Sequence, residues 1–285
     1  MNRFYGILFL WLLNSIVMAC QVEDDAGHLI TLPHPAKRII SLAPDLTELL
    51  FAAGANDHIV GVMKGSDFPK EAKNIPIVAN FNDIDVERVL VLHPDLIVVW
   101  AEGGILHQLK NSDVPIYVSH QHHLRDIPYT LERLGCLAGT EKIANKNAKQ
   151  FVQRYHYLQK KYSTQKTESV FYEMWPKPLV TITKASWINE VITLCGGKNI
   201  FADLPGVAPE INLEAVIRAN PAVIIGGKNK NNWGETWKAW PELSAVKHHA
   251  VFSMDDDFLQ RAGPRILEGA QKMCALLEES RLQQF

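Results

Sequence analysis

The chain has 285 residues, with 29 Lys or Arg against 31 Asp or Glu, so its formal net charge at pH 7 is −2. This near balance, without a block of basic residues, argues against nucleic acid or an acidic membrane surface as a partner. A hydrophobic content of 47% is ordinary for a globular protein, and the length is sufficient for two lobes with cores of their own.

The first 19 residues have the features of a secretory signal peptide. Arg3 supplies a positive charge, residues 4–13 are apolar, and Ala19 offers a small residue at the cleavage flank. The apolar run is short for a membrane span, so a retained anchor is the lesser alternative. We therefore expect an exported protein. Cys20 follows Ala19 directly, as in bacterial lipoproteins, and tethering through a lipidated Cys20 stays open.

The next segments predict alternating strands and helices. Residues 21–36 are expected to form a short hairpin or arm, and residues 39–42 a strand. A helix then runs to Gly54, with Asp45 or Thr47 as its cap. Two more short strands are expected before residue 80.

An internal repeat indicates two related lobes. Residues 85–100 (DVERVLVLHPDLIVVW) and 212–227 (NLEAVIRANPAVIIGG) each place an acid, Glu87 or Glu214, before a short helical pattern. In each, a proline follows seven residues after the acid, and a β-rich apolar run closes the unit. The order of helix, turn and buried strand therefore occurs twice.

Residues 140–162 contain no Gly or Pro and carry apolar or aromatic residues at helical spacings. They predict one helix of about 30 Å, long enough to cross a small domain. An ordinary surface helix of a single domain is the alternative. Because the sequences on either side resemble each other, we expect an α/β protein of two lobes, 20–139 and 163–285, joined by this single long backbone helix.

The four cysteines show neither CxxC spacing nor a Cys/His pair at zinc-finger spacing. Because export permits disulfides, we expect Cys195, at the end of a helix of the second lobe, to pair with Cys274 in the C-terminal helix. Two buried free thiols are the alternative. Cys136, within RLGCLAG, is expected in the core.

Five segments resemble the bacterial periplasmic cobalamin-binding proteins: RIISLAPDLTELLFAAG, SDFP, DVERVLVLHPDLIVVW, NEVITLCGGKNIF and FLQRAGPRI. That family supplies the substrate-binding subunits of vitamin B12 ABC importers, within a wider class that also carries ferric siderophores and haem. The resemblance covers nearly the whole mature chain in the same motif order. It implies a periplasmic protein of the class III binding-protein fold, monomeric when free. Such a protein holds cobalamin between its lobes and delivers it unchanged to an inner-membrane permease with its ATPase.

The resemblance also implies that aromatic side chains clamp the corrin ring. Trp100 matches the family and Phe81 stands where a Trp is familiar, whereas Gly65 and Ala208 stand where the family has a Tyr and a Trp. Other aromatic residues, and two charged ones able to bond the ligand's amide side chains, are expected to compensate. The candidate ligand-binding residues are Phe81, Trp100, Tyr172, Trp175, Asp257, Phe258 and Arg261.

By motif position, the resemblance makes Glu87 and Glu214 the acids that dock onto arginines of the permease, one on each lobe. Two carboxylates on separate lobes would form a symmetric contact that senses the separation of the lobes. Acids near helix N-termini are also favoured by the helix dipole, and the two roles can coexist.

Three histidines, His120, His122 and His123, follow the apolar strand VPIYV, at a strand end where α/β sites commonly lie. Zinc capture is a remote alternative, because one loop supplies only part of a ligand set, and we expect no resident metal site. Haem or a ferric siderophore is the closer alternative, with Tyr172 or His122 as an axial ligand. The chain lacks GxSxG, HExxH, P-loop and GxGxxG patterns, which argues against a hydrolase or another enzyme.

Overall fold

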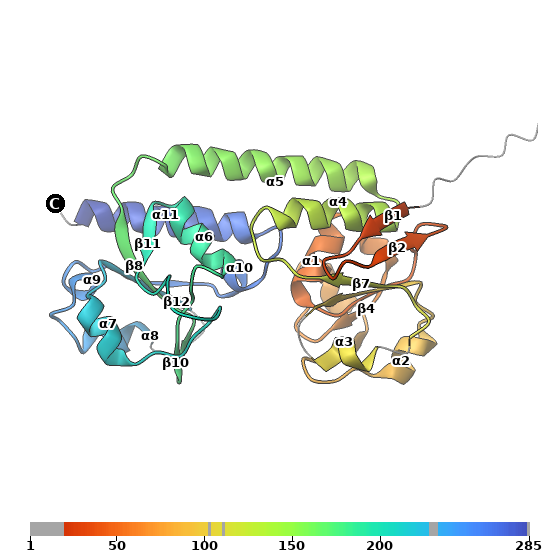
Figure 1. Cartoon of the computed structure of the whole chain (residues 1–285), viewed down its shortest axis with the longest axis horizontal. Helices are drawn as coiled ribbons and strands as arrows, with labels where there is room; N and C mark the ends of the chain where they lie inside the picture. Colours follow the sequence, from red (N-terminus) through yellow and green to blue (C-terminus); the bar gives the residue numbers. More distant parts are fainter. Residues whose placement is uncertain (1–19, 102–103, 110–111, 228–232, 284–285) are drawn as a thin grey trace, which may run out of the picture.

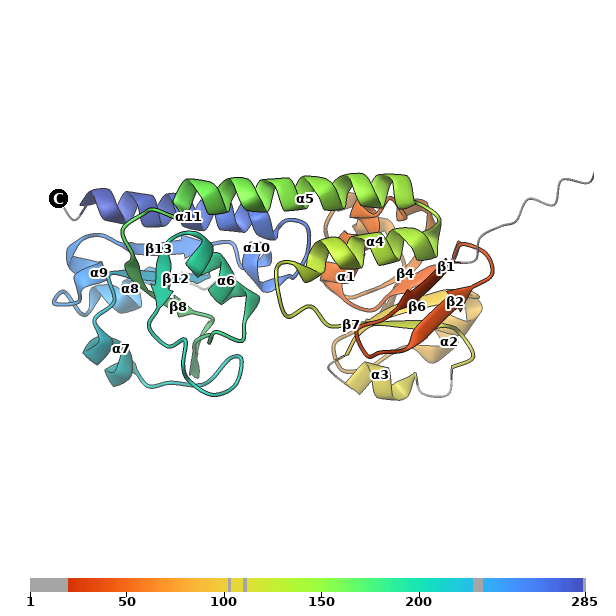
Figure 2. The ribbon, with the colours of Figure 1, turned by 45° about the horizontal axis from the view of Figure 1, so that its top comes forward.

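The computed structural model describes residues 20–101, 104–109, 112–227 and 233–283 (Figure 1). The expected signal peptide lies outside these residues. Two α/β lobes stand next to each other, and one long helix, α5 (Glu141–Tyr162), crosses from the first lobe to the second (Figures 1 and 2). Among the described residues, no helix combines the length and the hydropathy needed to cross a membrane.

The first lobe is built on a five-stranded sheet in which every neighbouring pair is parallel. Its spatial order is β5 (Ile77–Ala79), β4 (Ile59–Met63), β3 (Ile39–Ser41), β6 (Leu96–Trp100) and β7 (Ile116–Ser119). Its helices are α1 (Pro44–Ala52), α2 (Val86–Val91), α3 (Gly104–Gln108) and α4 (Asp126–Ala138), with short 3-10 turns at Asn56–His58 and Lys70–Asn74. The chain order reverses between β3 and β6, which is where a doubly wound sheet opens a crevice at its carboxyl edge.

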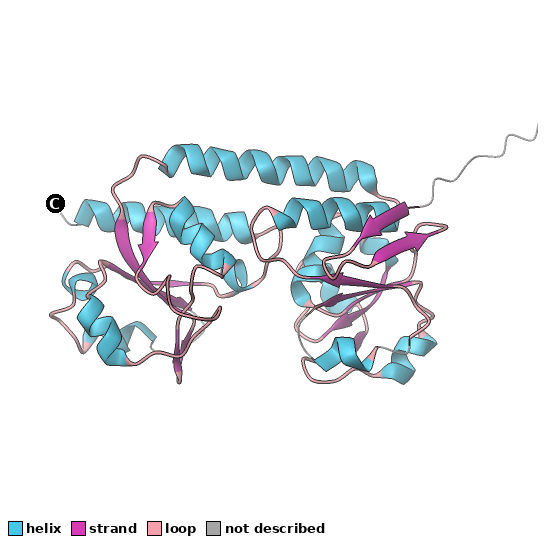
Figure 3. Cartoon of the chain, viewed as in Figure 1, coloured by secondary structure: helices cyan, strands magenta, loops and turns pink. Residues whose placement is uncertain are grey.

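The second lobe repeats this plan with a four-stranded parallel sheet (Figure 3). Its order is β11 (Gly197–Asn199), β8 (Glu168–Glu173), β12 (Val223–Gly227) and β13 (Val251–Met254). Its helices are α6 (Trp187–Leu194), α7 (Leu213–Ala219), α8 (Trp233–Lys238), α9 (Ser244–Lys247), α10 (Asp257–Gln260) and α11 (Ile266–Gln283). A small antiparallel pair, β9 (Trp175–Pro176) and β10 (Leu179–Val180), projects from this lobe.

The internal repeat is visible in the backbone as well as in the sequence. Asp85 and Asn212 each cap the following helix by accepting a hydrogen bond from the backbone N–H three residues on. After each short helix, the residue directly before the proline, His93 or Asn220, has a φ of 43°. The two α–turn–β units are therefore built alike, one in each lobe.

The connecting helix buries a narrow stripe: Ala144, Ala148, Phe151, Leu158 and Tyr162. Small residues let it approach α4 closely, since a Cβ atom on Gly135 of α4 would lie 2.2 Å from the Cβ atom of Ala144. Ile143 and Val152, two other apolar residues of this helix, are 47% and 39% exposed. The start and end of the helix agree with the sequence expectation to within one residue.

Two disulfides connect segments that are distant in sequence. Cys195, the C-cap of α6, is joined to Cys274 of α11, which is the pair expected from the sequence. Cys20 is joined to Cys136, a pairing that was not expected from the sequence, and Cys136, expected in the core, is only partly buried. This bond ties the hairpin of β1 (Cys20–Glu23) and β2 (Leu29–Leu32) to α4.

Candidate ligand-binding cleft

A cavity of about 160 Å³ lies between the two lobes. The first lobe contributes residues from the carboxyl ends of β6 and β7 and from the start of α1, and the second lobe contributes residues that flank α6 and α10. Its wall includes Asp45, Trp100 and Ser119 on one side and Trp187, Val207 and Ala262 on the other. The cavity thus opens at the crevice that the chain order of the first sheet creates.

Trp100 is held in this wall by a hydrogen bond from its indole Nε1 to Oδ2 of Asp45, at 2.9 Å. Asp45 is fully buried at the start of α1, and burial raises the pKa of its carboxyl to about 7 although the Trp100 bond opposes this. The bond fixes the plane of an aromatic ring that is only partly buried. Trp100, expected from the sequence to contact ligand, is therefore presented to the cavity in a defined orientation.

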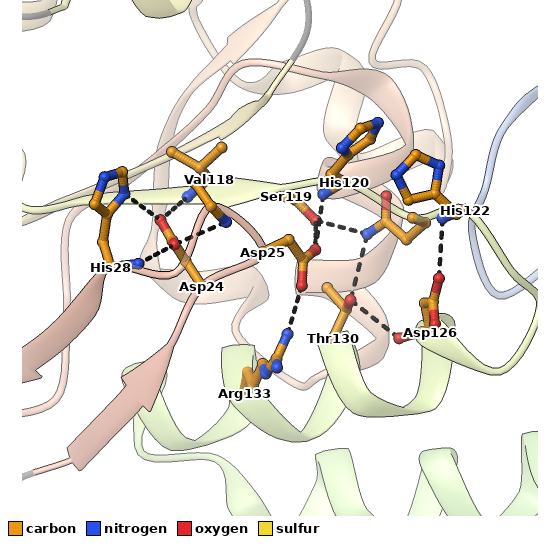
Figure 4. A network of polar contacts seen from close by, with 12 residues as sticks. Asp24, Asp25, His28, Val118, Ser119, His120, His122, Asp126, Thr130 and Arg133 are labelled. Atoms are coloured by element: carbon orange, nitrogen blue, oxygen red, sulfur yellow. Dashed lines mark hydrogen bonds and ion pairs between the residues drawn. The ribbon is translucent and has the colours of Figure 1, made fainter.

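The histidine loop 119–123 forms the neighbouring part of the wall, with His120 and His122 lining the cavity (Figure 4). Carboxylates hold its backbone: Asp25 accepts a hydrogen bond from the N–H of His120 at 2.7 Å, and Asp126 accepts one from the N–H of His122 at 2.9 Å. The side chain of Arg133 in turn donates to Asp25 at 2.6 Å. The loop is thus tied both to the N-terminal arm and to α4.

His123 belongs to the same loop but faces elsewhere. Its Nδ1 pairs with the carboxylate of Glu190 on α6, and that carboxylate also accepts a hydrogen bond from the backbone N–H of Leu124 at 2.9 Å. This contact joins the two lobes beside the cavity. Within the described ranges, no group of three or more His, Cys, Asp or Glu gathers where it could hold a metal ion, which leaves the zinc alternative without a ligand set there.

A second contact between the lobes involves Arg261, one of the expected ligand-binding residues. Its guanidinium pairs with Glu48 of α1 at 3.0 Å, with Asp67 at 2.8 Å and with Asp257 at 3.1 Å. Arg265 binds Glu48 through two nitrogens, at 2.9 and 2.6 Å. Glu48 is almost fully buried, so the network closes one side of the space between the lobes.

The expected aromatic residues are dispersed rather than gathered at the cavity. Phe81 is 63% exposed and lies beside Gly65, on the first lobe. Trp175 is 54% exposed on β9, where its indole N–H donates to the carbonyl of Lys177. The ring of Phe258 packs against α11, with the Lys272 ammonium 3.5 Å from its centroid.

Tyr172 does not fit the role expected for it. The side chain is 2% exposed within the core of the second lobe, and this burial raises the pKa of its phenol. The neighbouring Phe171 is also buried, packed against Phe201 and Trp237. Because helices cover both faces of a parallel sheet, successive strand residues are buried in turn, and Tyr172 is a core residue rather than a ligand contact.

Trp187 and Asp45 are among the residues of the cavity wall that sequence reasoning missed. Trp187 opens α6 and donates a hydrogen bond to the carbonyl of Leu259 at 2.7 Å, which sets its ring opposite the first lobe. An aromatic residue directly after the helix-capping Ser186 was a signal available in the sequence. Asp45 was one of two residues expected to cap α1. The N-cap of α1 is instead Ala43, and no side chain makes a capping hydrogen bond to this helix.

Another hollow, of about 860 Å³, lies where α5 crosses between the lobes. It is lined mainly by α4 and α5, including Tyr129, Phe151, Val152 and Tyr155. None of the described residues that line it belongs to a strand. The cavity at the strand ends, which both lobes enclose, is therefore the better candidate for binding a small molecule.

Glu87 and Glu214 occupy matching positions in the first turns of α2 and α7, and both are exposed. The two helices lie on the side of their lobes that faces away from α5 (Figures 1 and 2). The two acids are therefore available together to a partner that approaches this side.

Residues 39–258 match the family described as periplasmic binding protein. The vitamin B12-binding protein of Vibrio cholerae (strain O395) is 36% identical over 266 residues, which cover 92% of this chain and 96% of that protein. The vitamin B12-binding protein of Pectobacterium atrosepticum is 36% identical over 255 residues, covering 86% of this chain and 90% of that protein.

Solved structures agree with this placement. The crystal structure of the periplasmic vitamin B12 binding protein of Vibrio cholerae matches with a TM-score of 0.81 at 36% identity, covering 87% of this chain and 98% of that chain. The periplasmic haem-binding protein of Roseiflexus sp. RS-1 matches with a TM-score of 0.76 at 20% identity, covering 86% of this chain and 99% of that chain. The second likeness shows the fold alone. The expected two-lobed class III fold is confirmed, and the chain belongs to the periplasmic binding protein family.

Proposed function

We propose that this protein captures cobalamin or a related corrinoid in the cleft between its lobes and delivers it to the permease of an ABC importer. The observation that carries the proposal is the interlobe cavity at the carboxyl ends of β6 and β7, where Trp100 is oriented by Asp45. Relatives that are 36% identical over most of their length are named vitamin B12-binding proteins, which supports the same ligand. Binding and release leave the corrin ring and its side chains chemically unaltered.

The affinity would come from aromatic and apolar burial supplemented by a few polar contacts. Trp100 and Trp187 face the cavity from opposite lobes and would contact the ring first. Phe81, Trp175, Asp257, Phe258 and Arg261 remain proposed contacts for a ligand that extends beyond the enclosed cavity. We take residues 20–139 and 163–285 as the two lobes and 140–162 as the connecting segment.

The test is calorimetric titration of residues 20–285 with cyanocobalamin and, separately, with haemin. We expect one cyanocobalamin per chain at micromolar affinity or better and weak haemin binding. Trp100→Ala should weaken cyanocobalamin binding by about tenfold or more, a loss comparable to one aromatic stacking contact with its burial. The control is Tyr157→Ala, which removes an aromatic ring that is 65% exposed on α5. If haemin binds tightly and cyanocobalamin gives no heat of binding, the corrinoid proposal is refuted, and the ligand is haem or a ferric siderophore.

Docking on the permease through Glu87 and Glu214 is the second part of the proposal. The matching, exposed positions of the two acids on one side of the molecule support it. The Glu87→Lys, Glu214→Lys double variant should bind corrinoid normally but fail to deliver it to the cognate permease reconstituted in vesicles. Glu141→Lys is the control, because Glu141 is also an exposed first-turn acid but begins α5 on the other side. Undiminished delivery by the double variant would refute the docking role.

We also propose that the exported protein is free in the periplasm as a monomer and carries no lipid on Cys20. The disulfide between Cys20 and Cys136 supports the absence of the lipid, since it occupies the only atom to which the thioether could attach.

A further inference from the structure

Two imidazole rings lie together in the wall of the interlobe cavity (Figure 4). The ring centroids of His120 and His122 are 3.7 Å apart, and Figure 4 shows both rings on the same side of the loop. Side chains two residues apart on an extended chain point to the same face, which is how the loop brings both rings to the cavity. His122 is the more exposed of the two.

The loop that carries these rings is fixed before any ligand arrives. Asp25 and Asp126 each bind backbone N–H groups of the loop, at 2.7 to 2.9 Å, and Gln121 between the rings donates to Ser119 at 2.7 Å. Charge-assisted hydrogen bonds of this kind are the stronger ones in proteins. A donor on such a loop loses little further freedom when it binds, which favours affinity.

A free metal ion does not suit this arrangement. Zinc and similar ions need three or four protein ligands, and the part of the chain that the structure describes holds no group of three or more candidate donors. His123, the third histidine of the loop, is directed to Glu190 instead. A corrinoid changes this requirement, because its ring already supplies four nitrogens to the cobalt. One imidazole from the protein then completes the axial position, and imidazole is a donor that suits transition metals.

We propose that His122 supplies an axial nitrogen to the cobalt of the bound corrinoid. This inference rests on the proposed function and adds a specific contact to it. The step is a ligand exchange: a neutral imidazole nitrogen donates its lone pair to Co(III), the bond from cobalt to a bound water breaks, and the water leaves with its own electron pair. The oxidation state of cobalt is unchanged. Corrinoids that carry exchangeable water are therefore preferred over those that carry tightly held cyanide.

The test follows the visible absorption spectrum of aquocobalamin and of cyanocobalamin during titration with the protein. With aquocobalamin, the wild-type protein should convert the spectrum to that of a complex in which imidazole has replaced the bound water. Cyanocobalamin should bind without this conversion, and about tenfold more weakly. His122→Ala should bind both corrinoids with equal affinity and leave the aquocobalamin spectrum unconverted.

His156→Ala is the control, because it removes an exposed histidine of α5 that does not line the cavity. It should behave as the wild-type protein does, both in the spectrum and in the ratio of the two affinities. Thermal unfolding of each variant checks that the loop substitution has not altered the fold.

The outcomes separate this inference from the function on which it rests. Stoichiometric binding of aquocobalamin without spectral conversion would overturn the coordination by His122 while leaving corrinoid transport in place. Conversion that persists in His122→Ala would overturn it in the same way. If neither corrinoid binds, the proposed function fails and the inference fails with it.

Discussion

Glu48→Ala is expected to lower the free energy of unfolding by about 4 kcal/mol. In the folded protein, the Glu48 carboxylate accepts hydrogen bonds from Arg261 at 3.0 Å and from two nitrogens of Arg265 at 2.9 and 2.6 Å. Each hydrogen bond to a charged group contributes about 1.5–3 kcal/mol, and the desolvation of the ions offsets part of this sum. Without the carboxylate, two largely buried guanidinium groups lose their shared partner, although Arg261 keeps Asp67 and Asp257.

The assay is guanidinium-induced unfolding followed by far-UV circular dichroism. Glu48→Gln should lose less stability than Glu48→Ala, because the amide oxygen still accepts from one arginine. Asp203→Ala removes the partner of Lys184 in a pair that is mostly exposed, and its unfolding midpoint should match that of the wild-type protein. A loss below about 1 kcal/mol for Glu48→Ala would refute the reasoning, because it would mean that the buried pair adds nothing to what an exposed pair provides.

Three further predictions concern the disulfides and Asp45. Replacing Cys195 and Cys274 together by alanine should lower the free energy of unfolding by about 4 kcal/mol on the loop-entropy account, as measured by urea denaturation; an unchanged midpoint would contradict it. Burial raises the pKa of Asp45 from 3.8 to about 7, so the folded state keeps a proton that the unfolded chain releases, and stability falls as pH rises between these values. The free energy of unfolding of Asp45→Asn, relative to that of the wild-type protein, should therefore increase from about pH 4 to pH 7 and stay constant above pH 7. Parallel curves of stability against pH for the two proteins would exclude the raised pKa. Peptide mapping without reduction should find Cys20 linked to Cys136, and a lipid on Cys20 would disprove this.

Local periodicity and motif order were enough to predict the architecture. The connecting helix and the duplicated α–turn–β unit both follow from patterns that short sequence windows contain. The duplicated unit was the most informative, since its matching caps and positive-φ residues recur in both lobes. Such features depend on neighbours in the chain, and a single sequence displays them directly.

The cavity wall was harder to predict because it depends on pairings between distant residues. Trp100 is oriented by Asp45, 55 positions away, and Trp187 by the carbonyl of Leu259, 72 positions away. Burial of Tyr172 was missed for a related reason: in a strand covered on both faces, alternation no longer separates core from surface. The sequence around Cys136 gave no sign that Cys20, 116 positions away, would be its disulfide partner.

The N-terminal arm has a consequence for how the protein matures. Its acids Asp24 and Asp25 bind the backbone of β7 and of the histidine loop, and its disulfide to Cys136 anchors it to α4. The histidine loop, which lines the cavity, is thus supported by residues that immediately follow the expected signal peptide. The disulfide that anchors these residues forms only under oxidising conditions. Protein made in a reducing cytoplasm would lack this covalent tie, although it would keep the hydrogen bonds of Asp24 and Asp25. The covalent anchoring of the arm to α4 is therefore completed only outside a reducing compartment.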